Sequence, residues 1–338
     1  MKFTVGVALF LITAGAAFAE DSAKAVPFSS LSAPLQQAVQ KELAGGKLGE
    51  ITVTIENGEN TYDVEATKNG VSRAFTLAED GRLTGREVTL DEMPPKVKTA
   101  ILQQAGKATL TEIDQTFDDD EVIFEVELKL DGKLRSFSVA DDGVLLSAEI
   151  AFQELPPPVR KSVDALKGKG VVKSVEKDFD GPDTTYEIGI EEAGRERALS
   201  FSADGVMESS EVALAETPAP VQKTIQEHLN GGTVQNIDRN IDGNIVTYDV
   251  KVIGPGKADF SVAQSGALLS IRVSLAQVAP EARKTIQEKI GDGKILWIDQ
   301  VFGAGRNGGS PYEIQGRKNG KNFDFSVGPK GKFLGMDE

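Results

Sequence analysis

The side chains best suited to metal chemistry lie in one short acidic run. Asp238, Asn240 and Asp242 alternate as residues do at the start of a calcium-binding loop, and Asp249 stands at the twelfth place, where a Glu is usual. Aligned with the corresponding segments elsewhere in the chain, however, the run matches a strand, a hairpin turn and a second strand. Such a hairpin would place Asp249 on a different strand from Asp238. We therefore expect a structural hairpin, with weak calcium binding as the alternative and no other cofactor.

Residues for nucleophilic or zinc chemistry are scarce. The chain has one His, His228, and no Cys, so neither a Ser-His-Asp nor a Cys-His set nor a histidine-based zinc site can be assembled. His228 falls in the last turn of an expected helix, where a cation suits the helix dipole. Carboxylates are numerous, but nothing in the sequence brings two of them into one cleft. The sequence therefore predicts a protein that is not an enzyme.

Acidic residues recur at equivalent positions and are candidates for binding a partner. Aliphatic and aromatic residues alternate with them, so they should lie on the uncovered face of a sheet. Like charges on neighbouring strands repel, and stability alone would not obviously place them there. The alternative is a solvated face that keeps the protein soluble. The candidates are Asp63, Glu125, Glu127, Glu187, Asp249 and Glu313.

The C-terminal region departs from the rest of the chain. Ten positions separate Phe302 from Tyr312 where other parts take seven, and the added residues form a Gly-rich loop that carries Arg306. Loops of this kind often bind partners, so Arg306 joins the partner-binding candidates. Trp297, the only Trp, lies in an expected strand nearby. We expect it to pack in a core, with an exposed anchor as the alternative.

The elements that must position these residues come from five copies of a unit of about 62 residues. An apolar residue that should anchor a short helix recurs at Val39, Ile101, Val163, Ile225 and Ile286. An aromatic residue follows at Tyr62, Phe124, Tyr186, Tyr248 and Tyr312. The predicted repeats span residues 26–88, 89–150, 151–212, 213–273 and 274–338. The sheets of the repeats either join edge to edge into one surface or remain separate units connected by linkers.

Each copy predicts one helix and four strands. In the second copy, apolar residues spaced four apart in 97–105 indicate an amphipathic helix. Strands are expected at about 111–117, 123–130, 134–139 and 144–150, separated by hairpin signals such as Asp131-Gly132. Phe124 and Val126 alternate with Glu125 and Glu127. The predicted fold is therefore α+β, with each helix packed on one face of a four-stranded antiparallel meander and the other face bare.

The first residues and the composition indicate export. Lys2, an apolar run and Ala17-Phe18-Ala19 are typical of a signal peptide, predicted as residues 1–19. The net charge of −15 becomes −16 when Lys2 is removed with that segment. This acidity disfavours nucleic acid and anionic lipid as partners, and no second apolar stretch could cross a bilayer. We expect a periplasmic or secreted protein without membrane insertion.

A short core motif completes the pattern: an aromatic residue, an acid and an aliphatic residue, as in Phe124-Glu125-Val126 and Tyr186-Glu187-Ile188. With tandem units, a proline-led amphipathic helix and export, the chain resembles PepSY-like domains over roughly residues 26–336. The resemblance implies a helix on a four-stranded sheet, the fold also of the beta-lactamase inhibitory protein, which binds its partner through the open sheet. It implies no catalytic residues. The expected partner is an exported protein, such as a peptidase or another enzyme.

Overall fold

The structure, a computed structural model, describes residues 23–56, 59–118, 121–180, 183–254, 258–303, 311–318 and 321–337. The predicted signal peptide therefore lies outside the described residues. The chain divides into two compact parts, residues 1–86 and 87–338. Helices and antiparallel strands alternate in both parts, so the predicted α+β class is confirmed.

The first part is a helix on a small antiparallel sheet. Strand β1 pairs with β2, β2 with β3, β3 with β4 and β4 with β5. Leu35 and Val39 of the helix are buried against Val64 and Phe75 of the sheet. The elements are β1 (Lys24–Ala25), the 3-10 helix η1 (Phe28–Ser30), α1 (Ala33–Leu43), β2 (Lys47–Glu56), β3 (Glu59–Lys68), β4 (Val71–Ala78) and β5 (Leu83–Glu87), with the second part beginning at Glu87.

In the second part a 3-10 helix, an α-helix and four strands follow one another four times. We call these stretches the second to fifth segments, residues 24–87 being the first. The second segment has η2 (Leu90–Glu92), α2 (Pro95–Ala105), β6 (Thr109–Asp118), β7 (Glu121–Leu130), β8 (Lys133–Ala140) and β9 (Leu145–Glu149). The third has η3 (Phe152–Glu154), α3 (Pro157–Leu166), β10 (Val171–Asp180), β11 (Asp183–Glu192), β12 (Arg195–Ser202) and β13 (Met207–Glu211).

The last two segments repeat this order of elements. The fourth has η4 (Leu214–Glu216), α4 (Ala219–His228), β14 (Thr233–Asp242), β15 (Ile245–Ile253), β16 (Phe260–Ala263) and β17 (Leu268–Arg272). The fifth has η5 (Leu275–Gln277), α5 (Pro280–Ile290), β18 (Lys294–Val301), β19 (Tyr312–Lys318), β20 (Lys321–Val327) and β21 (Phe333–Asp337).

Strands β6 to β21 form one antiparallel meander in which each strand pairs with the next. The last strand of one segment pairs with the first strand of the next, at β9–β10, β13–β14 and β17–β18. We call these three junctions seams. Each has three residue pairs and a flanking amide hydrogen bond, such as the one that Ile150 N–H donates to Val175 O at 2.9 Å, and the third seam has a second one from Phe302 N–H to Leu269 O. Within the second part, the segments therefore join edge to edge.

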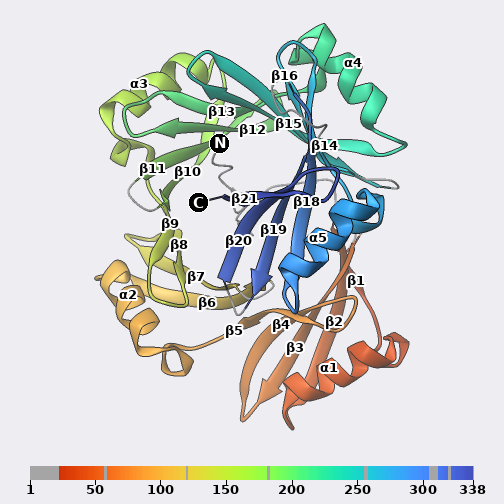
Figure 1. The fold of residues 1–338 in the computed structure, drawn as a ribbon. Coiled ribbons are helices and arrows are strands. Elements are labelled where there is room, and N and C mark those ends of the chain that lie inside the picture. The colour runs from red at the N-terminus through yellow and green to blue at the C-terminus, as the bar shows by residue number, and fades with distance from the viewer. Residues whose placement is uncertain are drawn as a thin grey trace. The chain divides into compact units, whose positions relative to one another are not determined.

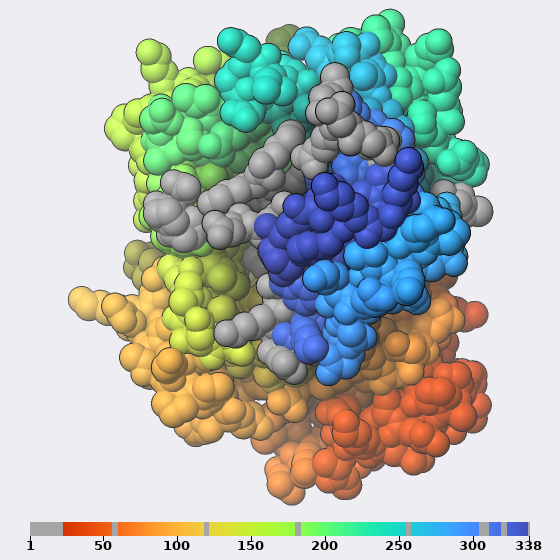
Figure 2. All heavy atoms as spheres, viewed as in Figure 1, coloured from red at the N-terminus to blue at the C-terminus, as the bar shows by residue number. Residues whose placement is uncertain are grey.

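Each helix covers one face of its own sheet (Figure 1). The predicted helix anchors are confirmed, because all five have no exposed surface: Val39, Ile101, Val163, Ile225 and Ile286. In the fifth segment, Lys289 Nζ lies 4.1 Å from the centroid of the Phe333 ring, and α5 and the C-terminal strand form one continuous surface (Figure 2). The cores are thus built from the apolar stripe of a helix and the inward residues of its strands.

The turns follow the chemistry that the sequence predicts. Asp131 and Gly132 have φ angles of 49° and 82°, as a two-residue hairpin of type I′ requires. Gly205, with φ 82°, packs against the first turn of α3, and a Cβ there would lie 2.6 Å from the backbone carbon of Pro158. Ser162 Oγ donates a hydrogen bond to Gly205 O at 2.7 Å. This turn therefore fastens the sheet to the N-terminal end of its helix.

Candidate functional site

The helix-free face of the sheet in the second part, which we call the open face, carries the predicted acidic residues. Glu125 lies between Phe124 and Val126, which belong to the helix-side core, so its side chain projects to the open face. The same alternation places Glu187, Asp249 and Glu313 on this face. The strand parity predicted for these acids is confirmed.

Carboxylates on neighbouring strands of the open face stand directly opposite one another. At the first seam Glu149 faces Glu176, and Glu176 in turn faces Glu187. At the second seam, Glu211 faces Asp238, and Asp238 faces Asp249. Residues opposite each other in an antiparallel pair have Cα atoms about 4.5–5.5 Å apart, close enough for like charges to repel. Each of these two seams therefore begins a row of three acids across three strands.

The second segment groups its acids as a square. Glu112 faces Glu127, and Asp114 faces Glu125, on strands β6 and β7. Burial raises the pKa of Asp114 to about 7, with further increases from Glu112, Glu87, Glu125 and Glu127. Burial likewise raises the pKa of Glu125, and repulsion from Glu176 adds to it. Ionising every member of this square is therefore costly at neutral pH.

The same effects act further along the open face. Burial raises the pKa of Asp178 to about 7, with repulsion from Glu176 and Glu187, and that of Asp238 to about 6, with repulsion from Glu211 and Asp249. The pKa of Glu187 is raised by partial removal from water and then by neighbouring acids, although water still reaches its side chain. The open face is thus an array of carboxylates that compete for protons.

The fifth segment differs because a cation replaces the first acid of its row. Arg272 faces Asp299 across the third seam, and its Nε donates to Asp299 Oδ1 at 2.6 Å. The Arg272 guanidinium also lies 5.1 Å from the centroid of the Trp297 ring. Trp297 Nε1 donates to Gln315 Oε1 at 2.9 Å, so this side chain lies on the open face with the acids. The prediction that Trp297 packs in the core is wrong.

A one-residue irregularity in each first strand explains that error. The register shifts between Ile295 and Trp297, so the alternation counted from Ile295 reverses before Ile298, which is buried against α5. Equivalent shifts occur in β2, β6, β10 and β14. A β-bulge is therefore present in the first long strand of every segment.

The open face is not uniformly bare. Ser138 and Ser147, which face each other on β8 and β9, are only 1% and 5% exposed. Their hydroxyl oxygens lie 2.8 Å apart, which satisfies one hydrogen bond for each buried group. The expectation of a bare face is therefore wrong for these serines, and acids of the same face such as Glu125 and Asp249 are themselves partly buried. Alternation predicts which side a residue faces, but it carries no information about depth.

The run with calcium-like spacing is a hairpin. Asp238 and Asn240 belong to β14, Asp242 ends it, and Asp249 belongs to β15, directly opposite Asp238. Asn240 Nδ2 donates to Asp249 Oδ2 at 2.7 Å, and Ser261 Oγ donates to Asp249 Oδ1. Among the residues that the structure describes, no group of three or more His, Cys, Asp or Glu is arranged to hold a metal ion. The expected strand, turn and strand are thus confirmed.

Two other candidates stand apart from this array. Asp63 belongs to the first part, where it lies between Thr52 and Thr76 in register and accepts a hydrogen bond from Thr76 Oγ1 at 2.8 Å. Asp63 therefore has no acid directly opposite it on either neighbouring strand. Arg306 lies outside the described residues.

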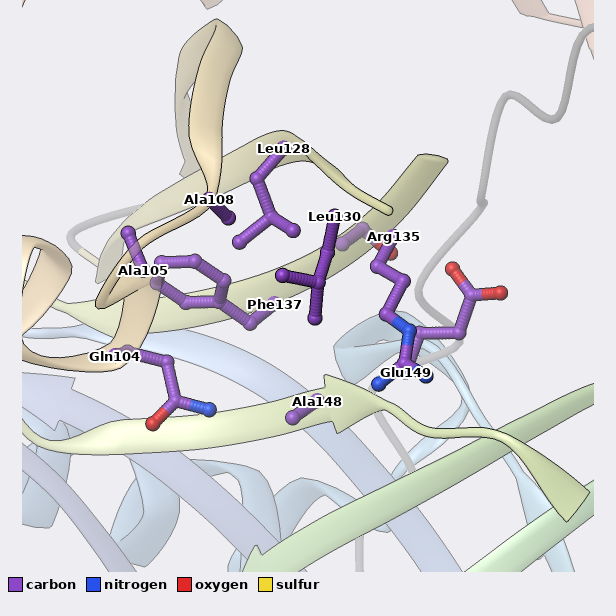
Figure 3. A pocket seen from close by; sticks show the side chains of 10 residues that line it. Gln104, Ala105, Ala108, Leu128, Leu130, Arg135, Phe137, Ala148 and Glu149 are labelled. Carbon is purple, nitrogen blue, oxygen red and sulfur yellow. The ribbon is translucent and has the colours of Figure 1, made fainter. Parts of the chain in front are cut away.

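A small hollow of about 90 Å³ lies in the second segment, beside the C-terminal end of α2 (Figure 3). Leu128, Leu130 and Phe137 surround it, with Arg135 and Glu149 at one side. Pockets for small-molecule ligands are usually about 300–1,000 Å³, so this hollow has room for a few waters. The hollow is thus too small to serve as a substrate pocket.

Comparison with known proteins concerns the fold alone. No family model and no curated protein matches the chain. Similar solved structures include a candidate calcium-regulated periplasmic protein from Bacteroides thetaiotaomicron, with 18% identity over 37% of this chain and 95% of that chain and a TM-score of 0.27. A BLIP-like protein from Bacteroides fragilis has 19% identity over 34% of this chain and 83% of that chain, with a TM-score of 0.26.

A candidate periplasmic protein from Bacteroides eggerthii has 16% identity over 34% of this chain and 85% of that chain, with a TM-score of 0.28. Across the described ranges, no helix is both long and apolar enough to span a membrane.

Proposed function

We propose that this chain is an exported, non-enzymatic binding protein built from five copies of a PepSY-like unit with a beta-lactamase-inhibitor-like fold. The copies correspond to residues 26–88, 89–150, 151–212, 213–273 and 274–338. The open face of the second part binds a cationic surface of another exported protein, such as an extracytoplasmic peptidase or another enzyme.

The facing carboxylates of the open face carry this proposal. Opposite acids such as Glu176 and Glu187 raise the free energy of the folded protein, because each ionises beside another. A cationic partner would relieve that repulsion on binding, so the cost in the free protein becomes affinity in the complex. Sequence selected for stability alone would replace these acids with Thr or Ser, as the neighbouring strands already do.

The fifth segment supplies groups of a different kind to the same face. Trp297 is partly exposed beside Arg272, and Trp and Arg are the side chains most often found at the energetic centre of protein interfaces. The acidic rows would guide a basic partner to the face through long-range attraction. The side chains of Trp297 and Arg272 would then add contact area and help to orient the bound partner.

Capture of exported proteins from the source organism tests the proposal. The mature protein serves as bait, beside a variant with Glu125→Lys, Glu187→Lys and Asp249→Lys. These changes remove repulsion, so the variant is expected to remain folded and to lose the captured partner, with affinity at least about 100-fold weaker if each reversal costs about 1 kcal/mol or more.

A matched control reverses charges on the helices. The control substitutions are Glu227→Lys on α4 and Glu288→Lys on α5. Both acids lie on helices, away from the open face, and each is near a Lys one turn earlier in its helix. The control is expected to retain the partner. Equal capture by wild type, the open-face variant and the control would contradict binding through the acidic face.

Cation binding by the acidic turns and rows is the alternative proposal. The crowding of acids such as Asp114 and Glu125 supports it, because a divalent ion would neutralise two facing carboxylates. Binding to the folded state alone raises the melting temperature by mass action. A calcium titration that leaves the melting temperature unchanged at millimolar concentration would dismiss this alternative.

A further inference from the structure

We propose that the seam between β9 and β10 is a pH-responsive joint, which tightens when its facing carboxylates share protons and loosens when they ionise. The seam between β17 and β18 carries an ion pair at the corresponding place and lacks this response. The inference goes beyond partner binding, because it concerns how neighbouring segments hold together and is tested on the protein alone.

The geometry of the seam makes charge decisive there. Three residue pairs join the strands, and one of them is Glu149 opposite Glu176. Another pair sets Asp178 opposite Ser147 on the same face. By comparison, β10 and β11 share nine residue pairs, so one repulsive pair weighs less between those two strands. Ionisation of Glu149 and Glu176 therefore acts on one of the three residue pairs of this seam.

The surroundings of the seam are acidic on both sides. Glu125 and Glu127 face it from β7, Asp178 lies on β10 itself, and Glu187 faces it from β11. The cation near Glu149 is Arg135 on β8, whose Nη1 lies 3.0 Å from Glu154 Oε2 and is already engaged by that acid. Ser147 donates a hydrogen bond to Glu176. Lys177, the other cation of this seam, pairs with Ala148 and has its Nζ 4.5 Å from the centroid of the Phe179 ring. On the open face, six carboxylates of the described residues thus lie near one shared guanidinium.

The direction of the response follows from these surroundings. Burial raises the pKa of Glu149, with added repulsion from Glu176 and Glu127 and partial relief from the Ser136 backbone and Arg135. Burial also raises the pKa of Glu176, which the Ser147 hydrogen bond partly offsets. An acid whose pKa is higher in the closed seam than in the open one stabilises closure as pH falls from about 8 to about 5. Above the raised pKa, that stabilisation is lost.

The third seam provides an internal comparison. Arg272 occupies the place of Glu149 and donates to Asp299 through Nε at 2.6 Å and Nη2 at 3.3 Å. Attraction between the guanidinium and the carboxylate replaces repulsion at this place. The two seams share the register of their three residue pairs, but an ion pair replaces the facing acids at the third seam and Val301 replaces Asp178.

Hydrogen exchange at equivalent amides tests the joint. Ile150 N–H donates to Val175 O at 2.9 Å beside the first seam, and Val273 N–H donates to Ile298 O at 2.9 Å beside the third. Protection factors, corrected for the intrinsic pH dependence of exchange, are measured from pH 5.5 to pH 8 in the full mature chain. We expect protection of Ile150 to fall as pH rises, and that of Val273 to change less than about twofold.

Two substitutions make the assignment specific. Glu149→Gln keeps the shape of the side chain and removes its charge, so protection of Ile150 should stay high at pH 8. Arg272→Glu places an acid opposite Asp299 and should confer the pH dependence on Val273. Glu196, an exposed acid near the start of β12, provides the matched control, and Glu196→Gln should change neither amide.

The outcomes separate clearly. Equal pH dependence at Ile150 and Val273 in the wild type would overturn the proposal, as would an unchanged response at Ile150 after Glu149→Gln. The isosteric Glu149→Gln variant removes a repulsive charge and is expected to fold, so the test does not depend on Arg272→Glu.

Discussion

Replacing Asp114 by Asn tests the cost of the carboxylate square directly. Asp114 faces Glu125, and its pKa rises from 3.8 to about 7. The variant keeps the size of the side chain but cannot ionise, so it removes one charge from between Glu112, Glu125 and Glu127. We expect it to be more stable than the wild type at pH 8.

The magnitude follows from the shift in pKa. Three pKa units correspond to a ceiling of about 4 kcal/mol at pH 8, at about 1.4 kcal/mol per unit. Water reaches part of the Asp114 side chain, so screening reduces the expected gain to about 1–2 kcal/mol. The gain is present above the folded pKa of about 7 and disappears towards pH 4, where Asp114 is protonated in the folded state.

Thermal unfolding at several pH values measures this gain. A gain of 1–2 kcal/mol should raise the melting temperature of a part of this length by about 2–6 °C at pH 8, with almost no change at pH 4. Asp141→Asn, in an exposed turn of the same segment, is the control and should change little at either pH. A variant at Asp114 that melts at or below the wild-type temperature at pH 8 would refute the reasoning.

Three further changes test the packing and the third seam. Gly205→Ala should lower the free energy of unfolding by about 2–4 kcal/mol, because the φ of Gly205 is positive and a Cβ there would meet the α3 backbone. Gly194 also has a positive φ but has open space around it, so Gly194→Ala should lower this free energy by only about 1 kcal/mol in denaturant unfolding. Phe201→Ala removes a fully buried ring and should cost about 3–5 kcal/mol, whereas Leu134→Ala at an exposed site should cost under about 1 kcal/mol in the same assay. Arg272→Gln should lower stability at pH 8 by about 1 kcal/mol, because it removes an ion pair and a ring contact, and calorimetry would contradict this if the variant melted at or above the wild-type temperature.

Periodicity made much of the fold predictable. Helix anchors such as Ile225 recur at a fixed interval and are buried as expected. Alternation about Val126 and Ile188 correctly placed Glu125 and Glu187 on the face away from the helix. These features depend on neighbours within a few residues, and local spacing is the information that a sequence displays most directly.

The pairing of acids across the seams was not predictable in this way. Glu149 and Glu176 belong to different predicted repeats, and their opposition depends on the register between segments, which the chain order does not fix. Trp297 escaped prediction because a one-residue bulge reverses the alternation before it. Both features arise from strand pairing, and the recurrence of acids in first and fourth strands was the one signal that could have suggested the rows.

The proposed recognition surface is tested most directly by a hydrogen-exchange footprint of the complex with the captured partner. We predict that the partner slows exchange in peptides from β7, β11 and β15, which carry Glu125, Glu187 and Asp249, and leaves peptides from α2 to α5 unchanged. Slowed exchange confined to the helices, with the acidic strands unaffected, would contradict the account.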